Sequence, residues 1–200
     1  MKEFSRNRDQ PKYDKKDVNL VTLSGFAGSG KSKLAKLFVA LGYEHISIWD
    51  MKRELANTMG LSIIQFNEFG ELEENKENFD FQYEKYQMQL DPREKIILDG
   101  RLSFKCQPQA FKVLLQVDPQ EAAKRIFYDK RETDHYASVE EVCQKTKERN
   151  AWDIARYFTL YNVDICNPDH FNLIIDTTHT AGPQDNFDFI MKKLLEFKGT

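Results

Sequence analysis

The chain has 200 residues, of which 40% are hydrophobic, 12% aromatic and 30% charged, and its formal net charge is −3. This composition can build one buried core under a well-solvated surface, which excludes general disorder. No apolar run approaches the roughly 20 residues that span a bilayer, and mixed charge gives no general attraction to nucleic acid. The three cysteines are widely spaced, so neither a disulfide framework nor a zinc site is expected. We therefore expect a reduced, monomeric protein of the cytoplasm, without membrane or nucleic-acid partners.

The N-terminal segment 1–17 carries charges of both signs and has neither apolar periodicity nor the apolar region of a signal peptide. It is predicted to be a flexible tail in front of a single domain over 18–200.

Short apolar runs alternate with helical patterns through that domain. Strands are predicted at 18–23, 45–48, 95–99, 111–117 and 172–176. Helices are predicted at 31–41, 51–59, 118–130, 138–161 and 185–197. In the first helix, Leu34, Leu37, Phe38 and Leu41 share one face. This alternation predicts an α/β fold in three layers, with a five-stranded, mostly parallel sheet between helices.

Two segments interrupt the alternation. Range 51–93 is rich in Glu, Phe and Tyr and is predicted to form short helices in an insert, whose acidic part, 68–80, can simply face solvent. The polar stretch 129–137 opens a lid region over 129–149, in which Lys130 and Arg131 are suited to a mobile loop.

The stretch GFAGSGKS, residues 25–32, fits GxxxxGK[ST] between a predicted strand and a predicted helix. Its glycines allow successive backbone N–H groups to point at phosphate oxygens, beside the positive end of the helix dipole. Lys31 can reach the β- and γ-phosphates, and Ser32 can ligate Mg²⁺. The stretch therefore predicts a P-loop for a nucleoside triphosphate. The residues assigned to it are Gly25, Gly28, Ser29, Gly30, Lys31, Ser32 and Lys33.

Phosphoryl transfer between two phosphates requires cations rather than a general base, because both partners are anions and the acceptor oxygen is already ionised. Asp50 and Arg53 follow the second predicted strand, where Asp50 can hold a water on Mg²⁺ and Arg53 the acceptor phosphate. Asp99 and Arg101 follow the third, at the edge where α/β sheets bind ligands. The alternatives are a helix cap with a solvated charge at the first place and a plain strand-ending turn at the second.

The long predicted helix carries Arg149, Asp153 and Arg156. At about 100° per residue these three side chains fall within one narrow stripe. Either the stripe faces the reacting phosphates, or it is a surface array of ion pairs that contributes only tenths of a kcal/mol.

With these motifs the chain resembles the nucleoside monophosphate kinases, and most of all the archaeal-type cytidylate kinases. SIWDMKR, residues 47–53, is similar to the family's Ser-x-x-Asp-x-x-Arg step. DGRLS at 99–103, the Arg149-x-x-x-Asp153-x-x-Arg156 spacing and LIIDTT at 173–178 also match. The resemblance covers residues 18–180.

The resemblance implies transfer of a phosphoryl group from ATP, with Mg²⁺, to a nucleoside monophosphate, expected to be CMP or dCMP. It implies Arg53 and Arg101 on the acceptor phosphate, Arg149 and Arg156 on the transferring group, and Asp153 orienting those arginines or touching the acceptor. The insert 51–93 would bind the acceptor. The implied catalytic residues are Lys31, Arg101, Arg149 and Arg156; the acceptor residues are Ser47, Asp50, Arg53, Asp99, Arg101 and Asp153; the metal ligands are Ser32 and Asp50.

Four features depart from the family pattern. Trp49 stands where related kinases have a small residue beside the acceptor base, and Asp99 replaces a more usual Glu. No tryptophan follows Leu102 and Ser103, and the range 68–80 is unusually acidic for a segment near an anionic ligand. Two other functions stay open. The first is dephospho-CoA kinase or another small-molecule P-loop kinase, and the second is a nucleotide-binding protein without catalysis.

Overall fold

The computed structural model describes residues 12–72, 75, 79–129, 136–180 and 182–199. The strands are β1 (Val21–Gly25), β2 (Glu44–Ser47), β3 (Ile96–Asp99), β4 (Phe111–Gln116) and β5 (Leu173–Asp176). The helices are α1 (Lys31–Ala40), α2 (Ile48–Thr58), α3 (Ile63–Glu71), α4 (Phe81–Met88), α5 (Ser103–Cys106), α6 (Pro119–Tyr128), α7 (Val139–Tyr161) and α8 (Pro183–Lys198). Two short 3₁₀ turns are η2 (Lys15–Asp17) and η3 (Pro168–His170).

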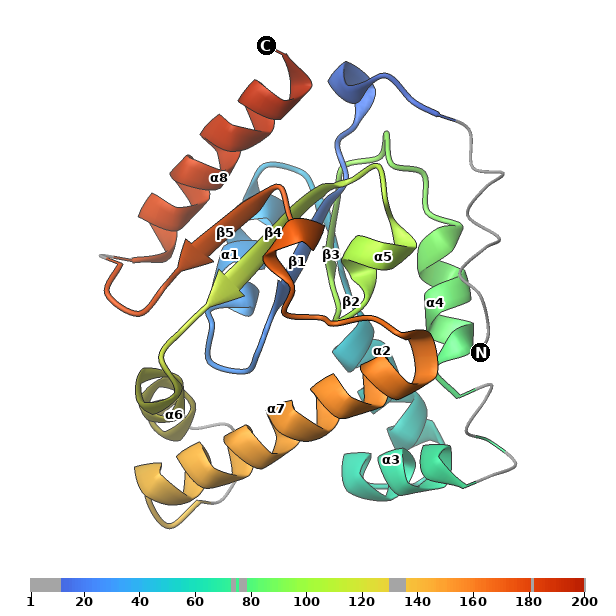
Figure 1. Ribbon diagram of the computed structural model, residues 1–200, viewed down its shortest axis with the longest axis vertical. Coiled ribbons are helices and arrows are strands. Elements are labelled where there is room, and N and C mark those ends of the chain that lie inside the picture. Colours follow the sequence, from blue (N-terminus) through green and yellow to red (C-terminus); the bar gives the residue numbers. More distant parts are fainter. Residues whose placement is uncertain (1–11, 73–74, 76–78, 130–135, 181, 200) are drawn as a thin grey trace.

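The five strands form one parallel sheet in the order β2-β3-β1-β4-β5, which confirms the predicted fold class. Asp99 at the end of β3 pairs in register with Leu23 of β1 and with Ser47 of β2. The carboxyl ends of β1, β2 and β3 therefore lie together at one edge of the sheet. In Figure 1, α7 crosses the molecule on the side of this edge.

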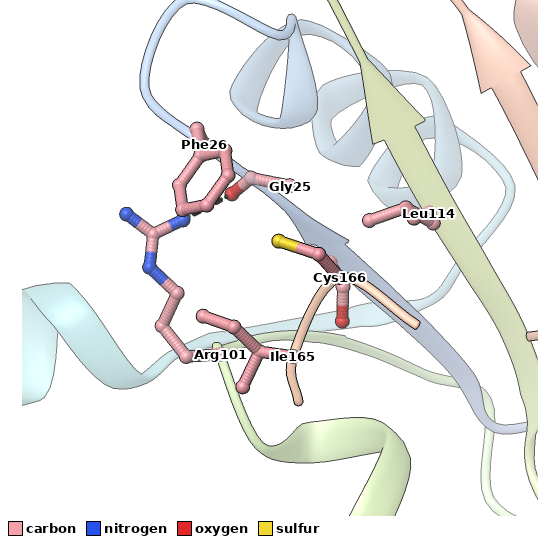
Figure 2. Close-up of a pocket in the computed structure, with 7 residues that line it drawn as sticks. Gly25, Phe26, Arg101, Leu114, Ile165 and Cys166 are labelled. Carbon is pink, nitrogen blue, oxygen red and sulfur yellow. Dashed lines mark hydrogen bonds between the residues drawn. The ribbon is translucent and has the colours of Figure 1, made fainter. Parts of the chain in front are cut away.

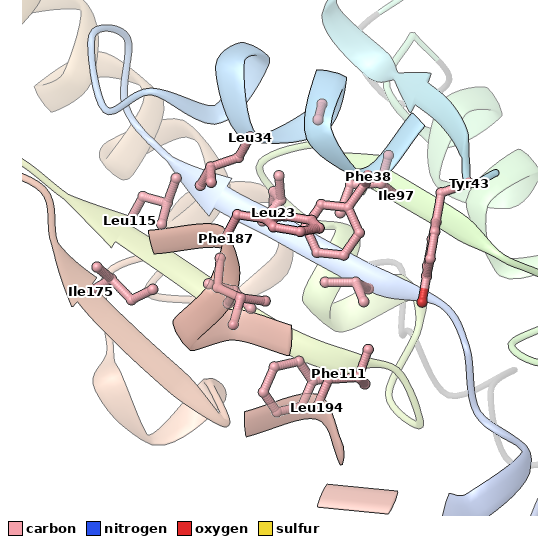
Figure 3. Packing of buried hydrophobic residues seen from close by; sticks show 14 residues of the cluster. Leu23, Leu34, Phe38, Tyr43, Ile97, Phe111, Leu115, Ile175, Phe187 and Leu194 are labelled. Atoms are coloured by element: carbon pink, nitrogen blue, oxygen red, sulfur yellow. The ribbon is translucent and has the colours of Figure 1, made fainter. Parts of the chain in front are cut away.

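Helices cover both faces of the sheet, because strand residues alternate between the two faces. Val21 and Leu23 pack on one face with α1 and α8, whose Phe38 and Phe187 rings meet at 5.0 Å between centroids (Figure 3). Leu20, on the other face, packs in a second cluster that includes Tyr83 of α4. The predicted three-layer arrangement is therefore present.

Several predicted boundaries shift by a few residues. The backbone N–H groups of Asn19 and Leu20 both donate to Pro92 O rather than to a strand, so β1 begins at Val21 and not at residue 18. Ile48 starts α2 instead of ending β2, because the Oγ of Ser47 accepts a hydrogen bond from the Asp50 N–H and caps the helix.

The apolar face predicted for α1 is correct apart from its last member. Leu34 and Phe38 are buried and Leu37 packs against them, whereas Leu41 is 49% exposed. The reason is that α1 ends at Ala40, so Leu41 is the C-cap residue and no longer continues the helical face.

Range 51–93 contains most of α2 together with α3 and α4. Its acidic part does not face solvent throughout, because Asp80 is only 2% exposed. A complete capping box at the start of α3, between Ser62 and Gln65, was not predicted.

The two predicted mobile segments are described only in part. Of the predicted tail 1–17, residues 1–11 lie outside the described residues. The Tyr13 N–H donates to Oε1 of Gln109 at 2.8 Å, and η2 follows. Of the predicted lid 129–149, residues 130–135, and with them Lys130 and Arg131, lie outside the described residues, and the range from 139 onward is helix α7. Within the described ranges, every helix is too short or too polar to cross a bilayer.

Candidate active site

The loop between β1 and α1 has the backbone that a phosphate cradle needs. Gly28 and Gly30 adopt φ values of 80° and 93°, in the left-handed region that favours glycine. At Gly28 a side chain is also excluded by space, because an added Cβ would lie 2.7 Å from the carbonyl oxygen of Ala122 in α6. The P-loop therefore packs directly on α6.

The cradle fits the phosphates of a nucleoside triphosphate. The N-cap of α1 is Gly30, with no side-chain cap and no acidic residue in the first turn, so the positive end of the helix faces the loop. The Oγ of Ser29 is buried without a hydrogen-bond partner. Lys31 Nζ donates to Gly25 O at 2.8 Å and to Phe26 O at 3.2 Å, which places its charge across the cradle.

A metal ion at this site would take some of its oxygen ligands from the phosphates of a bound nucleotide. Among the described residues, no group of three or more His, Cys, Asp or Glu side chains is placed to hold a metal ion. Ser32 is exposed in the first turn of α1, and Asp50 is exposed at the start of α2. Such hydroxyl and carboxylate oxygens suit Mg²⁺, which usually keeps few protein ligands beside phosphates and water.

Arg101 joins three parts of the site. Its Nη1 donates to Gly25 O, and its guanidinium lies 4.7 Å from the centroid of the Phe26 ring (Figure 2). Its Nε and Nη2 lie 3.0 Å and 2.9 Å from Oδ2 of Asp153 in α7. The end of β3 is thereby linked to both the P-loop and α7, beside a small pocket that also includes Ile165 and Cys166.

Gly100 allows a close approach between elements. An added Cβ would lie 2.9 Å from Cγ1 of Ile48 and closer still to Oγ of Ser103. The absence of a side chain allows the β3 end to approach α2 and α5.

Asp99 lies among the cations of the site. Burial raises the pKa of Asp99, while the charges of Lys31, His45 and Arg101 oppose that rise. Asp99 therefore lies within electrostatic reach of Lys31, and its role toward the acceptor stays a prediction.

The acceptor-side residues of α2 are close together. Asp50 Oδ1 lies 3.5 Å from Arg53 Nη1, and both side chains are exposed. The Arg53 guanidinium lies 5.9 Å from the centroid of the Trp49 ring, and Arg149, from α7, lies 4.3 Å from the same centroid. Arg53 and Arg149 are therefore brought together by one aromatic side chain.

The side chains of the α7 stripe, Arg149, Asp153 and Arg156, contact different partners. Asp153 pairs with Arg101, one of the arginines named with it in the sequence. Arg156 Nε donates to Oδ2 of Asp80 at 3.0 Å, and the side chains of this pair are 8% and 2% exposed. The burial of Asp153 and Arg156 contradicts the alternative of a surface array of ion pairs.

Two further groups were missed by the sequence analysis. Asp80 also pairs with Lys52 of α2, so it joins α2 to α7. Arg125 of α6 donates to Thr177 O at 2.7 Å and to Gly28 O at 3.4 Å, which ties the loop after β5 to the P-loop. Asp80 is one acid among many in its segment, and Arg125 one of several basic residues in its helix, so neither had a distinguishing signal.

Ser47 and Lys33 have local positions in the two helices. Ser47 caps α2, and Lys33 is exposed in the first turn of α1. Their predicted binding roles stay predictions.

A parallel α/β sheet, a phosphate cradle after its first strand and arginines at the carboxyl edge define a P-loop protein that handles nucleotides. Residues 21–153 match the family model described as "AAA domain". The chain is 31% identical to a cytidylate kinase of Methanosphaera stadtmanae over 186 residues, which are 90% of this chain and 99% of that protein. The chain belongs to the cytidylate kinase family of nucleoside monophosphate kinases.

Two other likenesses are informative. A nucleotide dehydratase of Lacinutrix mariniflava that depends on S-adenosylmethionine is 33% identical over 160 residues, 78% of this chain. The match takes 32% of that protein, so the chain spans about a third of its length. Shikimate kinase from Acinetobacter baumannii, solved with shikimate, has a TM-score of 0.57 and 19% identity, covering 90% of this chain and 94% of that one. This last likeness shows the fold alone.

Proposed function

We propose that the protein transfers the γ-phosphoryl group of ATP to CMP or dCMP in the presence of Mg²⁺. The observation that carries the proposal is Arg101, which touches the P-loop through Gly25 O and is oriented by Asp153 from α7. An arginine in this place can meet an acceptor phosphate next to the donor cradle. The relatives named cytidylate kinase favour a cytosine nucleotide as acceptor.

The donor side uses backbone amides and Lys31. The amides of residues 25–32 hold the β- and γ-phosphates, and Lys31 exchanges its carbonyl partners Gly25 and Phe26 for phosphate oxygens. Ser32 and Asp50 would hold Mg²⁺, which supplies positive charge against the phosphates. Since Asp50 lies 3.5 Å from Arg53, metal binding also affects the arginine assigned to the acceptor.

The transfer step needs no general base. An oxygen of the acceptor phosphate attacks the γ-phosphorus, the bond from that phosphorus to the bridging oxygen breaks, and ADP leaves with the bond's electrons. Arg53 and Arg101 hold the acceptor phosphate, and Arg149 and Arg156 stabilise the charge of the transferring group. Because Arg156 is paired with Asp80 in this structure, its contact with phosphate requires it to leave that carboxylate.

An acceptor panel tests the proposal. ADP formation from ATP is measured with CMP, dCMP, UMP, AMP, GMP and dephospho-CoA offered singly, and CMP or dCMP is expected to give the highest kcat/KM. Preference for dephospho-CoA, or ATP binding without product from any acceptor, would support the alternative functions and reject this one.

Two substitutions test the assigned residues. Lys31→Ala and Arg101→Ala are each expected to lower kcat about 100-fold or more, because each removes a cation that stabilises the transferring phosphate. Lys36→Ala, which removes an exposed lysine from α1, is the matched control and is expected to keep wild-type kcat. Circular dichroism checks that the fold is intact; near-normal kcat in Lys31→Ala would remove that residue from the mechanism.

A further inference from the structure

Trp49 has an unusual position between two arginines from different helices. It is the second residue of α2 and is half-buried. Arg53 lies one turn further along α2, with its guanidinium 5.9 Å from the centroid of the indole ring. Arg149 of α7 lies 4.3 Å from the same centroid. One aromatic ring thus contacts an arginine assigned to the acceptor and an arginine assigned to the transferring group.

The physical effect of this ring is to keep like charges near each other. Two guanidinium groups repel, but each is attracted to the negative face of an indole ring. The carboxylate of Asp50 lies 3.5 Å from Nη1 of Arg53 and limits where that side chain points. Arg149 is exposed and long, and the indole ring offers its guanidinium a surface that narrows the range of rotamers it samples.

We propose that Trp49 is a positioning residue that couples acceptor binding on α2 to the placement of Arg149 on α7. The inference rests on the proposed function, since it assigns Trp49 a part in the same phosphoryl transfer. When an acceptor phosphate binds Arg53, the anion lowers the repulsion between the two guanidiniums, and Arg149 remains at the ring, facing the transferring group. Trp49 acts on the reaction through these arginines.

Kinetics of two substitutions separate this role from simple packing. Trp49→Leu keeps an apolar side chain but has no aromatic face, whereas Trp49→Phe keeps a ring. We expect Trp49→Leu to raise the KM for the acceptor and lower kcat, each about tenfold, with little change in the KM for ATP. Trp49→Phe is expected to recover most of both losses. Equal losses in the two variants, or a change confined to the KM for ATP, would overturn the proposal.

Fluorescence follows the ring directly. The chain has two tryptophans, so Trp152→Phe leaves Trp49 as the reporter. Trp152 is 46% exposed and its ring lies 5.1 Å from the Arg156 guanidinium, so phenylalanine is chosen to keep a ring at that place, and kinetics in this background serve as the reference for the titration. Titration with the preferred acceptor, beginning with CMP, is expected to change Trp49 emission in a saturable way. The change is expected to be lost in Arg53→Ala. A Trp49 emission that stays constant when the acceptor is added would contradict the coupling.

A double-substitution comparison keeps the two proposals distinguishable. Trp49→Leu is expected to lower the unfolding midpoint in the parent protein and to have a smaller effect in an Arg149→Ala background, because the contact is then already absent. This comparison uses no substrate, so it holds even where the acceptor panel fails. Equal effects of Trp49→Leu on the unfolding midpoint in both backgrounds would reject the Trp49–Arg149 contact. If the parent protein is an active kinase and Trp49→Leu has the same kcat and KM, the role of Trp49 is rejected while the proposed function stands.

Discussion

Glu84 is a carboxylic acid in a place that excludes water. It is 4% exposed, and its Oε2 accepts a hydrogen bond from the Tyr161 hydroxyl at 2.9 Å. Burial raises the pKa of Glu84 to about 8, and the negative charge of Asp80 acts in the same direction. The group is therefore largely protonated at neutral pH.

This shift makes the free energy of unfolding depend on pH. Between the ordinary pKa of 4.5 and about 8, the folded state binds more protons at Glu84 than the unfolded state does. The stabilisation is therefore complete below pH 4.5 and is lost as the pH rises toward 8, by at most about 1.4 kcal/mol per pH unit. Glu84→Gln keeps an acceptor for the Tyr161 hydroxyl but cannot titrate, so urea unfolding at pH 5, 6.5 and 8 is expected to show a flatter dependence. If the slope of the unfolding free energy against pH is unchanged in Glu84→Gln, the pH dependence does not come from Glu84.

The sequence patterns identified the phosphate-binding loop but not the side chains that pair with Arg156 and Asp153. The string from Gly25 to Ser32 indicated a phosphate cradle because its function depends on neighbouring backbone groups. The partners of Arg156 and Asp153 were not predictable, because Asp80 and Arg101 lie far from them along the chain.

At the scale of elements, the contact between the P-loop and α6 gives a sharp test. Gly28→Ala places a Cβ 2.7 Å from Ala122 O at a φ of 80°, while Gly42→Ala has nearly the same φ, 81°, and no atom within 4 Å. Both variants bear the backbone strain, but only Gly28→Ala must move α6. We expect Gly28→Ala to be less stable than Gly42→Ala by about 2 kcal/mol. We also expect it to bind ATP more weakly.

Thermal unfolding and ATP titration of the two variants measure these differences. Equal unfolding midpoints, together with unchanged ATP affinity, would show that the loop does not depend on this close approach.

The elements themselves were largely predictable, since strand and helix periods are local. Strand order was not, and neither was α5, whose four residues are too few for a periodic signal. The start of α7 has the serine half of a capping box, in which Ser138 Oγ accepts a hydrogen bond from the Glu141 N–H. The glutamate reaches the N–H of Ala137 instead of that of Ser138.

Across the whole molecule, Asp80 links the helical range 51–93 to α7. It pairs with Lys52 and with Arg156, and all three side chains are buried or nearly so. Removing the carboxylate charge leaves both cations without their main partner in a water-poor place, which is costly. We expect Asp80→Asn to lower the free energy of unfolding by about 3 kcal/mol.

The matched control is Asp91→Asn, which removes an ion pair with Arg93 whose side chains are 31% and 57% exposed. Its expected cost is below about 1 kcal/mol, because water screens an exposed pair. Both variants are compared by urea unfolding at neutral pH; similar costs would mean that Asp80 does not join the helices.

The amino-acid sequence by itself determined the phosphate cradle, the α/β class and the arginines available for phosphate, since each depends on residues close together in the chain. Only the tertiary structure decided which side chains those arginines meet: Arg101 at Gly25 and Asp153, Arg149 at Trp49, and Arg156 at Asp80. The physical reason is that a guanidinium takes whichever anion, carbonyl or ring the packing of distant helices brings within its reach.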